Sequence, residues 1–518
     1  MKKLLLTIGL IFFCVSFLLP REQKAERITL TLDDCILKAL ENNLDISVEA
    51  FNPEISEVSI IASREAFMPR FNFGYFNLHQ NRLGSWWVEG ANVITNRNFY
   101  SVGLTQKIIT GGEISLSFTN TTTDTTQNLI IVNPTYGSEL RLDFSQPLLK
   151  NFGPKINRRE IKLAQNNRDI SVSQLKSQLI QTVYEVEQVY WNLVYAHENL
   201  NVQEYFLEQS KERLKRNREG AKIGTKSPLE VLSSETDVAR WEESILSARL
   251  QVEEREDQLR KIMNLPTDVL GLSRSILPID KPTVEKKEIS FEQALKIALE
   301  ERPELAVSRK RIENSDIDVS YYKNQLLPQL DLRASLWYPG QSGDVLIYEN
   351  NDFIRGNVIG KIKGSKGDSL EDVFKLTYDN WQVRLDLTVP LSNFISRADL
   401  ARANVEKEQK LLEREKQEKS IYYEILKIIK ELKTNEKKID SSARYKELME
   451  KQFEAEEQRY QLGLVGSQWL LRYQSDLASA KVQEIRAIID YKMSIAELEK
   501  VLGMNLKTKN IKFRNYDF

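Results

Sequence analysis

Cysteine and histidine are nearly absent from this chain of 518 residues. Two cysteines, Cys14 and Cys35, and two histidines, His79 and His197, occur, in unrelated surroundings. Two isolated histidines do not match the ligand spacing of a metal site. No GxxxxGK[ST], GxGxxG or GxSxG motif is present. We therefore expect no enzyme: no catalytic residues, no cofactor-binding residues and no metal ligands.

An excess of one charge is also missing. Lys and Arg together number 73, and Asp and Glu number 74. A chain without a net basic field has no general attraction for nucleic acid, so we expect no nucleic-acid partner. Hydrophobic residues make up 41% and charged residues 28%, which is typical of a folded chain.

Long hydrophobic runs are absent after the N-terminus. Lys2 and Lys3 precede an apolar run that extends from Leu4 to about Phe13. This pattern predicts a signal peptide at residues 1–20, with an N-terminal membrane anchor as the alternative. No later stretch reaches the roughly 18 apolar residues of a spanning helix, so a membrane crossing would require strands. An exported chain with only Cys35 left can form no intramolecular disulfide, which favours a bacterial envelope protein.

The chain repeats itself. A shift of 259 residues aligns ALE at 39–41 with ALE at 298–300, and Pro69 with Pro328, without a gap. A shift of 239 residues aligns Gly224 with Gly463. A period this long indicates a duplicated domain-sized unit. We predict a first repeat at 28–280, a second at 281–505 and a C-terminal tail at 506–518.

Each repeat starts with two predicted helices, a short one (about 31–43 and 290–302) and a longer one (about 45–67 and 304–326). The longer helix has to end before Pro69 or Pro328, because the residue before proline avoids helical geometry.

The period then changes to two, which predicts strands within about 70–146 and 329–389. Leu140, Leu142 and Phe144 alternate with Glu139, Arg141 and Asp143, and the stretch 382–387 repeats this pattern. A half-buried strand of a soluble sandwich also alternates. Charged residues on the second face of both repeats favour a barrel with lipid outside and water inside. Extra strand-like sequence at 99–107 and 112–119 could extend the barrel strands or fold as a separate hairpin.

Heptad spacing follows the strands. Val231, Val238, Ile245, Val252 and Leu259 are seven residues apart, and the second repeat has a similar series that Lys446 and Glu484 interrupt. Sustained heptads predict coiled-coil helical hairpins at about 157–264 and 395–502. Gly224 and Gly463 suit the turns at their tips.

The order of these elements, given twice, resembles the TolC-like outer-membrane efflux and secretion channel family over about residues 28–505. The pieces that carry the resemblance are ALENN at 39–43, FMP at 67–69, QPLL at 146–149, YQLGL at 460–464 and VLG at 501–503. The fold class that we expect is an α+β membrane protein with duplicated long helical hairpins and β-hairpins. The resemblance implies a homotrimer with four strands per chain, which close a twelve-stranded β-barrel that continues into a periplasmic α-helical barrel.

The resemblance also implies the function of an outer-membrane exit duct. Such a duct serves a tripartite efflux pump or a type I secretion system and conducts substrates passively from the periplasm to the exterior. The implied partners are outer-membrane lipid, a periplasmic adaptor (membrane fusion) protein and an inner-membrane pump of RND or ABC type. The expected location is the bacterial outer membrane, with a large periplasmic portion. The alternative is a periplasmic coiled-coil adaptor or scaffold that does not span the membrane.

In this family the tunnel closes at the hairpin tips. The candidate gate residues are Glu230, Tyr460 and Arg472. By position after the tip glycine, we predict that Glu230 and Tyr460 form a hydrogen bond that holds the gate shut; the alternative is an ordinary coiled-coil acid and a seam tyrosine. Trp469 and Arg472 occupy positions where acids are expected, which argues against a carboxylate ring there. The predicted adaptor-contact residues are those of the two tips: Ile223, Gly224, Thr225, Leu462, Gly463 and Leu464.

Overall fold

The computed structural model describes residues 28–84, 92–265, 275–284, 286–352, 354 and 356–513. The predicted signal peptide lies outside the described residues. The chain divides into two compact units. Unit 1 comprises Met1–Phe51, Ser173–Leu305 and Lys416–Phe518, and unit 2 comprises Asn52–Val172 and Ala306–Glu415.

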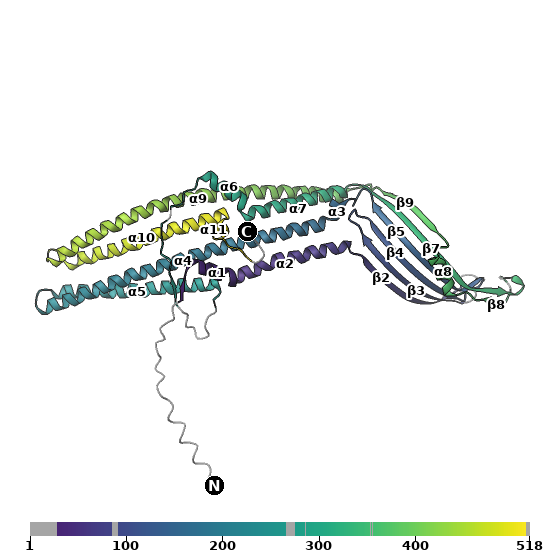
Figure 1. Cartoon of the computed structure of the whole chain (residues 1–518), viewed down its shortest axis with the longest axis horizontal. Helices are drawn as coiled ribbons and strands as arrows, with labels where there is room; N and C mark the ends of the chain where they lie inside the picture. The colour runs from purple at the N-terminus through teal and green to yellow at the C-terminus, as the bar shows by residue number, and fades with distance from the viewer. Residues whose placement is uncertain are drawn as a thin grey trace, which may run out of the picture. The chain divides into compact units, whose positions relative to one another are not determined.

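The elements follow one another in an order that occurs twice, with helices first, then strands, then two long helices (Figure 1). In chain order they are β1 (Ile28–Leu30), α1 (Leu32–Asn42), α2 (Leu44–Arg64), η1 (Glu65–Phe67), β2 (Arg70–Leu83), β3 (Asn92–Lys107), β4 (Glu113–Thr125), β5 (Val132–Pro147), α3 (Pro154–Asn157), α4 (Arg159–Lys222), α5 (Pro228–Met263), β6 (Ile276–Pro278), α6 (Phe291–Glu301), α7 (Pro303–Gln325), β7 (Gln329–Tyr348), η2 (Glu349–Asn351), β8 (Val358–Ile362), α8 (Lys366–Phe374), β9 (Asn380–Thr388), α9 (Phe394–Gln461), α10 (Ser467–Leu502) and α11 (Asn505–Thr508).

The helix starts have local causes in the sequence. Thr31 is the N-cap of α1 and Ser290 is the N-cap of α6, and the hydroxyl of each accepts a hydrogen bond from the backbone N–H of the third helical residue. The predicted short helices are therefore found within two residues of their expected bounds. The longer helices that follow, α2 and α7, both end before the expected prolines, Pro69 and Pro328.

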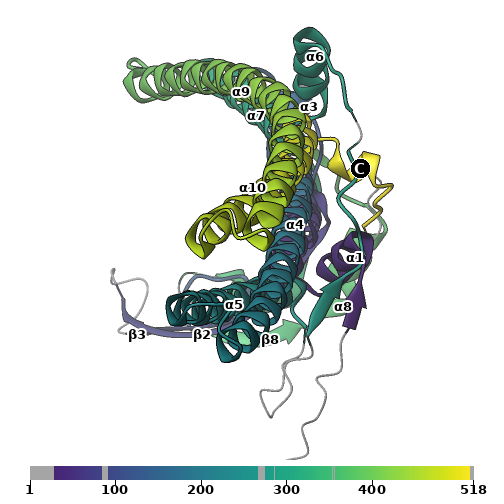
Figure 2. The same cartoon turned by 90° about the vertical axis from the view of Figure 1, so that its left-hand side faces the viewer.

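In unit 1 the long helices form two antiparallel hairpins, α4 with α5 and α9 with α10. Seen end-on in Figure 2, α5, α4, α10 and α9 stand side by side in one curved layer, and α1 and α6 lie on its convex side. The buried positions of α5 recur every three or four residues, as in Trp241, Ile245, Ala248 and Val252. This spacing puts the buried side chains on one stripe of the helix. No helix among the described residues has the length and apolar character needed to cross a membrane.

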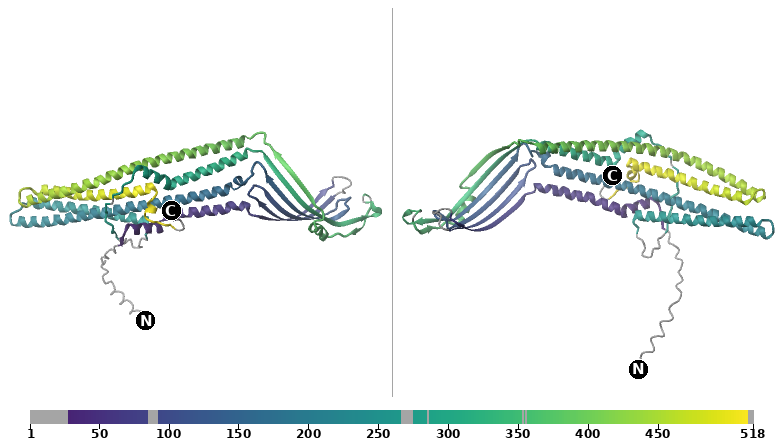
Figure 3. Two further views of the ribbon diagram at one scale, coloured as in Figure 1. Left: turned by 45° about the horizontal axis from the view of Figure 1, so that its top comes forward. Right: turned by 180° about the vertical axis from the view of Figure 1, so that it is seen from behind.

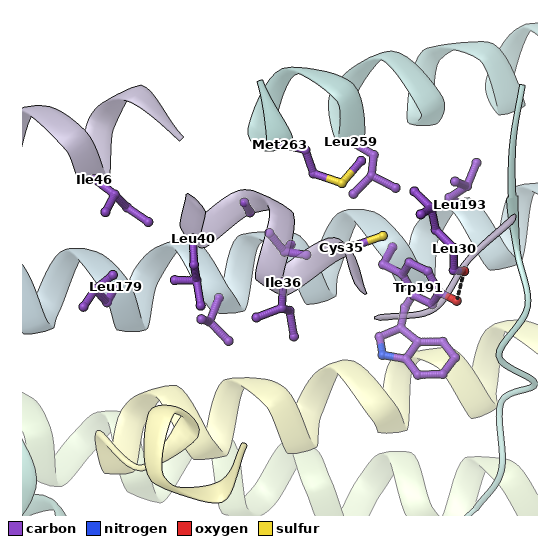
Figure 4. Close-up of a cluster of buried hydrophobic side chains, with 14 of the residues drawn as sticks. Leu30, Cys35, Ile36, Leu40, Ile46, Leu179, Trp191, Leu193, Leu259 and Met263 are labelled. Atoms are coloured by element: carbon purple, nitrogen blue, oxygen red, sulfur yellow. Dashed lines mark hydrogen bonds between the residues drawn. The ribbon is translucent and has the colours of Figure 1, made fainter. Parts of the chain in front are cut away.

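The main core of unit 1 lies where α1 packs against the long helices. Leu40 of α1 and Ile46 of α2 lie near Leu179 of α4, and Met263 of α5 lies beside Cys35 (Figure 4). The Tyr190 hydroxyl donates to the carbonyl of Leu30 at 3.2 Å. That bond ties α4 to the short parallel pairing of β1 with β6.

Unit 2 contains one sheet with the strand order β2-β3-β4-β5-β7, and β9 and β8 both pair with β7 (Figures 1 and 3). Neighbouring strands are antiparallel. β5 pairs with one edge of β7 along residues 331–345. β9 and β8 therefore share the other edge of β7, β9 at residues 329–337 and β8 at residues 345–348.

The expectation of four strands per chain is wrong for the described residues. The strand-like segments 99–107 and 112–119 are parts of β3 and β4, which form an antiparallel hairpin between β2 and β5. Six strand positions therefore lie side by side, and the twelve-strand count does not follow from this chain. The structure also has a helix that the sequence analysis does not predict, α8, which starts with a capping box of Ser365 and Asp368.

Candidate functional site

One face of the sheet in unit 2 is apolar across six strands. Side chains of a strand alternate between faces, and directly opposed residues of antiparallel strands share a face. The register therefore places the following residues in one row: Phe71, Leu104, Leu116, Leu142, Leu336 and Trp381. The next row contains Phe73, Val102, Phe118, Leu140 and Tyr338.

Most of this apolar face is uncovered by the chain itself. Phe71 is 68% exposed at one edge of the sheet and Trp381 is 72% exposed at the other. On β7 the apolar residues run from Leu330 to Tyr338, a length of about 27 Å at about 3.4 Å per residue. An apolar band about 25 Å tall is what the hydrocarbon layer requires of a lipid-facing sheet.

The opposite face is polar and charged. One row contains Arg70, Thr105, Ser115, Asp143, Ser335 and Gln382. Ser335 donates to Asp143 at 2.6 Å, and Arg384 pairs with Asp386 at 2.9 Å. Arg141 lies over the ring of Trp337, 4.9 Å from its centroid. Charged side chains that pair with one another on an open face are suited to contact with water.

The two faces together have the chemistry of a wall between lipid and water. Among the described residues, the terminal strands β2 and β9 pair on one side only. An unpaired strand edge leaves backbone N–H and C=O groups unsatisfied, and this is costly in lipid. The wall is therefore incomplete in a single chain and needs further strands at both edges.

The predicted tip residues lie at the ends of the two helical hairpins of unit 1. Gly224 and Gly463 have φ angles of +79° and +74°, which favour glycine. Three of the predicted adaptor-contact residues are apolar and strongly exposed: Ile223 at 76%, Leu462 at 74% and Leu464 at 67%. Thr225 differs, since its hydroxyl donates to the carbonyl of Gly220 at 3.1 Å and helps to shape the turn.

The predicted hydrogen bond between Glu230 and Tyr460 is not formed within the chain. The Tyr460 hydroxyl donates instead to Asn217 Oδ1 at 3.1 Å. The Glu230 carboxylate accepts from Ser227 N at 2.9 Å and from Lys226 Nζ at 3.0 Å. Glu230 is therefore engaged in capping α5, because its residue lies three positions after the N-cap.

Lys226 connects the two predicted gate residues. Its ammonium group lies 4.4 Å from the centroid of the Tyr460 ring while it binds Glu230. Partial burial raises the pKa of Glu230, but the Ser227 and Lys226 hydrogen bonds outweigh it, so this pKa lies below its usual value. The structure thus brings Glu230 and Tyr460 near one another through a lysine that sequence reasoning missed.

A buried polar layer follows further along the same helices. Ser210 donates to Asp237 at 2.5 Å, and Gln474 donates to Ser210 at 3.1 Å. Arg213 donates to the side-chain oxygen of Gln474 and lies 3.7 Å from Asp237. All four residues are at most 6% exposed. Burial lowers the pKa of Arg213, and the charge of Asp237 opposes this shift.

This layer links the first hairpin to the second, because Gln474 belongs to α10 and the others to α4 and α5. Sequence reasoning did not identify it. The available signal was a polar residue within an apolar seam, Gln474 between Leu470 and Leu477. Arg472 does not join the layer, since its side chain is exposed and lies 4.0 Å from Asp476.

A sheet with one lipid-compatible and one polar face, joined to very long helical hairpins, defines a class of membrane channel. Residues 136–265 and 294–504 match the sequence profile of the outer membrane efflux protein family. The matched residues exceed half of the chain, so the chain belongs to this family. The family is one of outer-membrane efflux channels rather than enzymes, which also favours the channel over the adaptor or scaffold alternative.

Solved structures share the fold. The Campylobacter jejuni CmeC outer membrane channel has a TM-score of 0.63 and 17% identity, with 92% of this chain and 89% of that chain covered. The Neisseria gonorrhoeae MtrE outer membrane channel, in its open state, has a TM-score of 0.61 and 17% identity, with 92% and 89% covered. The Vibrio cholerae outer membrane protein VceC has a TM-score of 0.61 and 12% identity, with 91% and 96% covered. A search of curated proteins returned no match by sequence.

Proposed function

We propose that three copies of this chain form an outer-membrane exit duct that conducts substrates passively from the periplasm to the exterior. In this proposal the sheets join edge to edge around a water-filled bore, and the helical hairpins continue the tunnel into the periplasm. The observation that carries the proposal is the band of apolar residues across the sheet, which covers six strands and is backed by a charged face.

The open strand edges support assembly. In the part of the chain that the structure describes, β2 at one edge and β9 at the other have no strand on their outer side and can pair with another chain. Pairing the β9 edge of one chain with the β2 edge of the next repeats head to tail, and it closes a ring. Closure leaves no edge exposed to lipid.

The partners in this proposal are a periplasmic adaptor and an inner-membrane pump of RND or ABC type, as part of a tripartite efflux pump or a type I secretion system. The apolar tip residues Ile223, Leu462 and Leu464 are exposed to an extent that suits a protein contact. The charged polar face of the sheet would line the bore and keep it wet.

The tips would also hold the tunnel closed. The Tyr460–Asn217 hydrogen bond joins α9 to α4, and Lys226 contacts both Tyr460 and Glu230. These contacts fasten the end of the second hairpin to the end of the first. A partner that binds the tips could open the tunnel by competing for them.

Cell fractionation followed by gel electrophoresis tests the assembly. We expect the full chain in the outer-membrane fraction, with a band at three times the chain mass when the detergent sample is not heated and a single-chain band after heating. A soluble periplasmic monomer would contradict the proposal.

Site-specific photo-crosslinking tests the partner. Probes at Ile223 and Leu462 should capture the adaptor, whereas a probe at Val48 of α2, which is similarly exposed at 67%, should not. Equal capture at all three positions, or none at the tips, would remove the tips as the adaptor contact.

A further inference from the structure

The β3–β4 hairpin is part of the sheet rather than an appendage. β3 pairs with β2 from Asn92 to Thr105, and β4 pairs with β5 from Glu113 to Thr123. The strands alternate in direction, so β2 and β5 run antiparallel to one another with the hairpin between them. The hairpin therefore adds two strands to the sheet and leaves the direction of every other strand unchanged.

The hairpin also has one apolar face and one polar face, like the rest of the sheet. On β4, Leu116 lies in the apolar row that contains Leu142 and Leu336, and Ser115 lies in the polar row that contains Asp143 and Ser335. A hairpin that folded into water on both sides would not need this alternation, because no face of it would meet lipid.

The turn of the hairpin is fastened to the start of the helical part of unit 2. The Thr110 hydroxyl donates to Gln146 Oε1 at 2.7 Å, and Gly153 N donates to the Thr110 carbonyl at 2.9 Å. Gly111 has a φ angle of +98°, and a Cβ there would meet the Asn151 carbonyl oxygen at 2.3 Å. The turn is thus closely packed against the connection between β5 and α3.

We propose that the β3–β4 hairpin widens the membrane barrel from twelve strands to eighteen. The proposal rests on the homotrimer proposed above: three chains with six strand positions each give eighteen. β8 does not add a position, because it shares one edge of β7 with β9.

The consequence is a wider outer opening. The diameter of a barrel grows roughly in proportion to its number of strands, so eighteen strands give a bore about 1.5 times as wide as twelve. Barrels of 16 to 18 strands leave an open aqueous channel. The sheet would then admit bulky solutes, and the narrowest point would lie at the hairpin tips.

Cysteine labelling in the outer membrane tests the position of the hairpin. The background is low, since Cys35 is fully buried and burial raises the pKa of its thiol to about 12. We expect Ser115→Cys to react with a water-soluble maleimide and Leu116→Cys not to react with it.

Two variants on β7 are matched controls, because Ser335→Cys and Leu336→Cys lie in the same two rows of the sheet. If β7 shows the alternation and β4 reacts with water-soluble reagent at both positions, the hairpin lies outside the wall and this proposal is overturned. If β7 also lacks the alternation, the proposed membrane wall itself fails.

Electron microscopy of the full chain in detergent gives the count directly. We expect a ring of eighteen strands, about 1.5 times the diameter of a twelve-stranded one. A ring of twelve strands, with residues 92–125 elsewhere, would overturn the proposal while leaving the trimeric duct intact.

Discussion

Lys446 of α9 and Glu484 of α10, the residues that interrupt the heptad series of the second hairpin, form an ion pair with each other at 2.9 Å. Each was an exception within its own helix. The structure shows that the two exceptions occupy one position of the interface and compensate for one another. An acid and a base that face each other in an apolar seam fix the register of two helices, because any shift separates them.

We predict that removing one partner destabilises this hairpin and that removing both does not. Lys446→Met alone leaves Glu484 half-buried without its cation, and we expect a loss of about 0.5 to 1 kcal/mol. The double variant Lys446→Leu with Glu484→Leu completes the heptads and should be at least as stable as the natural chain. Thermal unfolding followed by the helical circular dichroism signal measures both.

The exposed pair of Lys451 and Glu447, 2.6 Å apart on α9, is the matched control. Lys451→Met should leave the unfolding temperature unchanged. An equal loss of stability in Lys446→Met and Lys451→Met would mean that burial of the Lys446–Glu484 pair in the seam has no role. The Glu484 hydrogen bond raises the pKa of Lys446. The pair therefore contributes fully below the ordinary lysine pKa of about 10.4 and loses its contribution as pH rises through the raised value.

The tip contacts predict a leaky channel when Tyr460 loses its hydroxyl. Tyr460→Phe removes the hydrogen bond to Asn217 and keeps the ring that Lys226 contacts. With one link between α9 and α4 gone, we expect a higher single-channel conductance or more frequent openings in planar bilayers. Tyr445→Phe, an exposed tyrosine on the same helix, should behave like the natural chain. Identical conductance in all three would argue that Tyr460 only packs in the seam.

The Lys446–Glu484 pair and the contacts of Tyr460 show which features local sequence predicts and which it does not. Heptad spacing placed the hairpins, and Gly224 and Gly463 placed their turns, because both signals are local in the chain. The partner of Tyr460 is 243 residues away. No local pattern specifies which of several polar residues on a distant helix will face it. The gate bond between Glu230 and Tyr460 therefore stays a prediction, while within the chain the Tyr460 hydroxyl binds Asn217.

In the sheet, too, local sequence predicts the strands but not their long-range pairing. Alternation identified strand-like sequence within β3 and β4, because successive side chains of a strand point to opposite faces of the sheet. Which strand lies next to which is decided by pairing across the whole sheet, and two arrangements of the hairpin were compatible with the pattern. α8 is a different case, because Ser365 and Asp368 form a capping box that is readable in the sequence.

The buried carboxylate of Glu187 predicts a pH dependence. Burial raises the pKa of Glu187, although Lys509, 2.7 Å away, lowers it. The folded chain thus holds the proton more tightly than the unfolded chain does. As pH rises from the ordinary glutamate pKa of about 4.3 through the raised pKa of Glu187, the natural chain should lose stability relative to Glu187→Gln.

Unfolding temperatures of both chains between pH 4 and pH 8 measure this difference. Lys509→Met removes the cation that opposes the shift, so it should steepen the decline. A constant difference between the natural chain and Glu187→Gln across the range would show that Glu187 titrates alike in the folded and unfolded chains.

The last prediction concerns the close contact between Gly340 of β7 and α8, which packs on the apolar face of the sheet. Ser369 of α8 donates to Ser138 at 2.7 Å, and Val373 is fully buried there. A Cβ at Gly340 would meet the Ser369 carbonyl oxygen at 2.0 Å, so Gly340→Ala has to push α8 away. Gly137→Ala on β5 is the control, because its Cβ would meet nothing within 4 Å. We expect trypsin to cleave at Lys366 or Lys375 faster in Gly340→Ala than in Gly137→Ala or the natural chain. Equal cleavage in the three chains would show that the position of α8 does not depend on its close contact with Gly340 of β7.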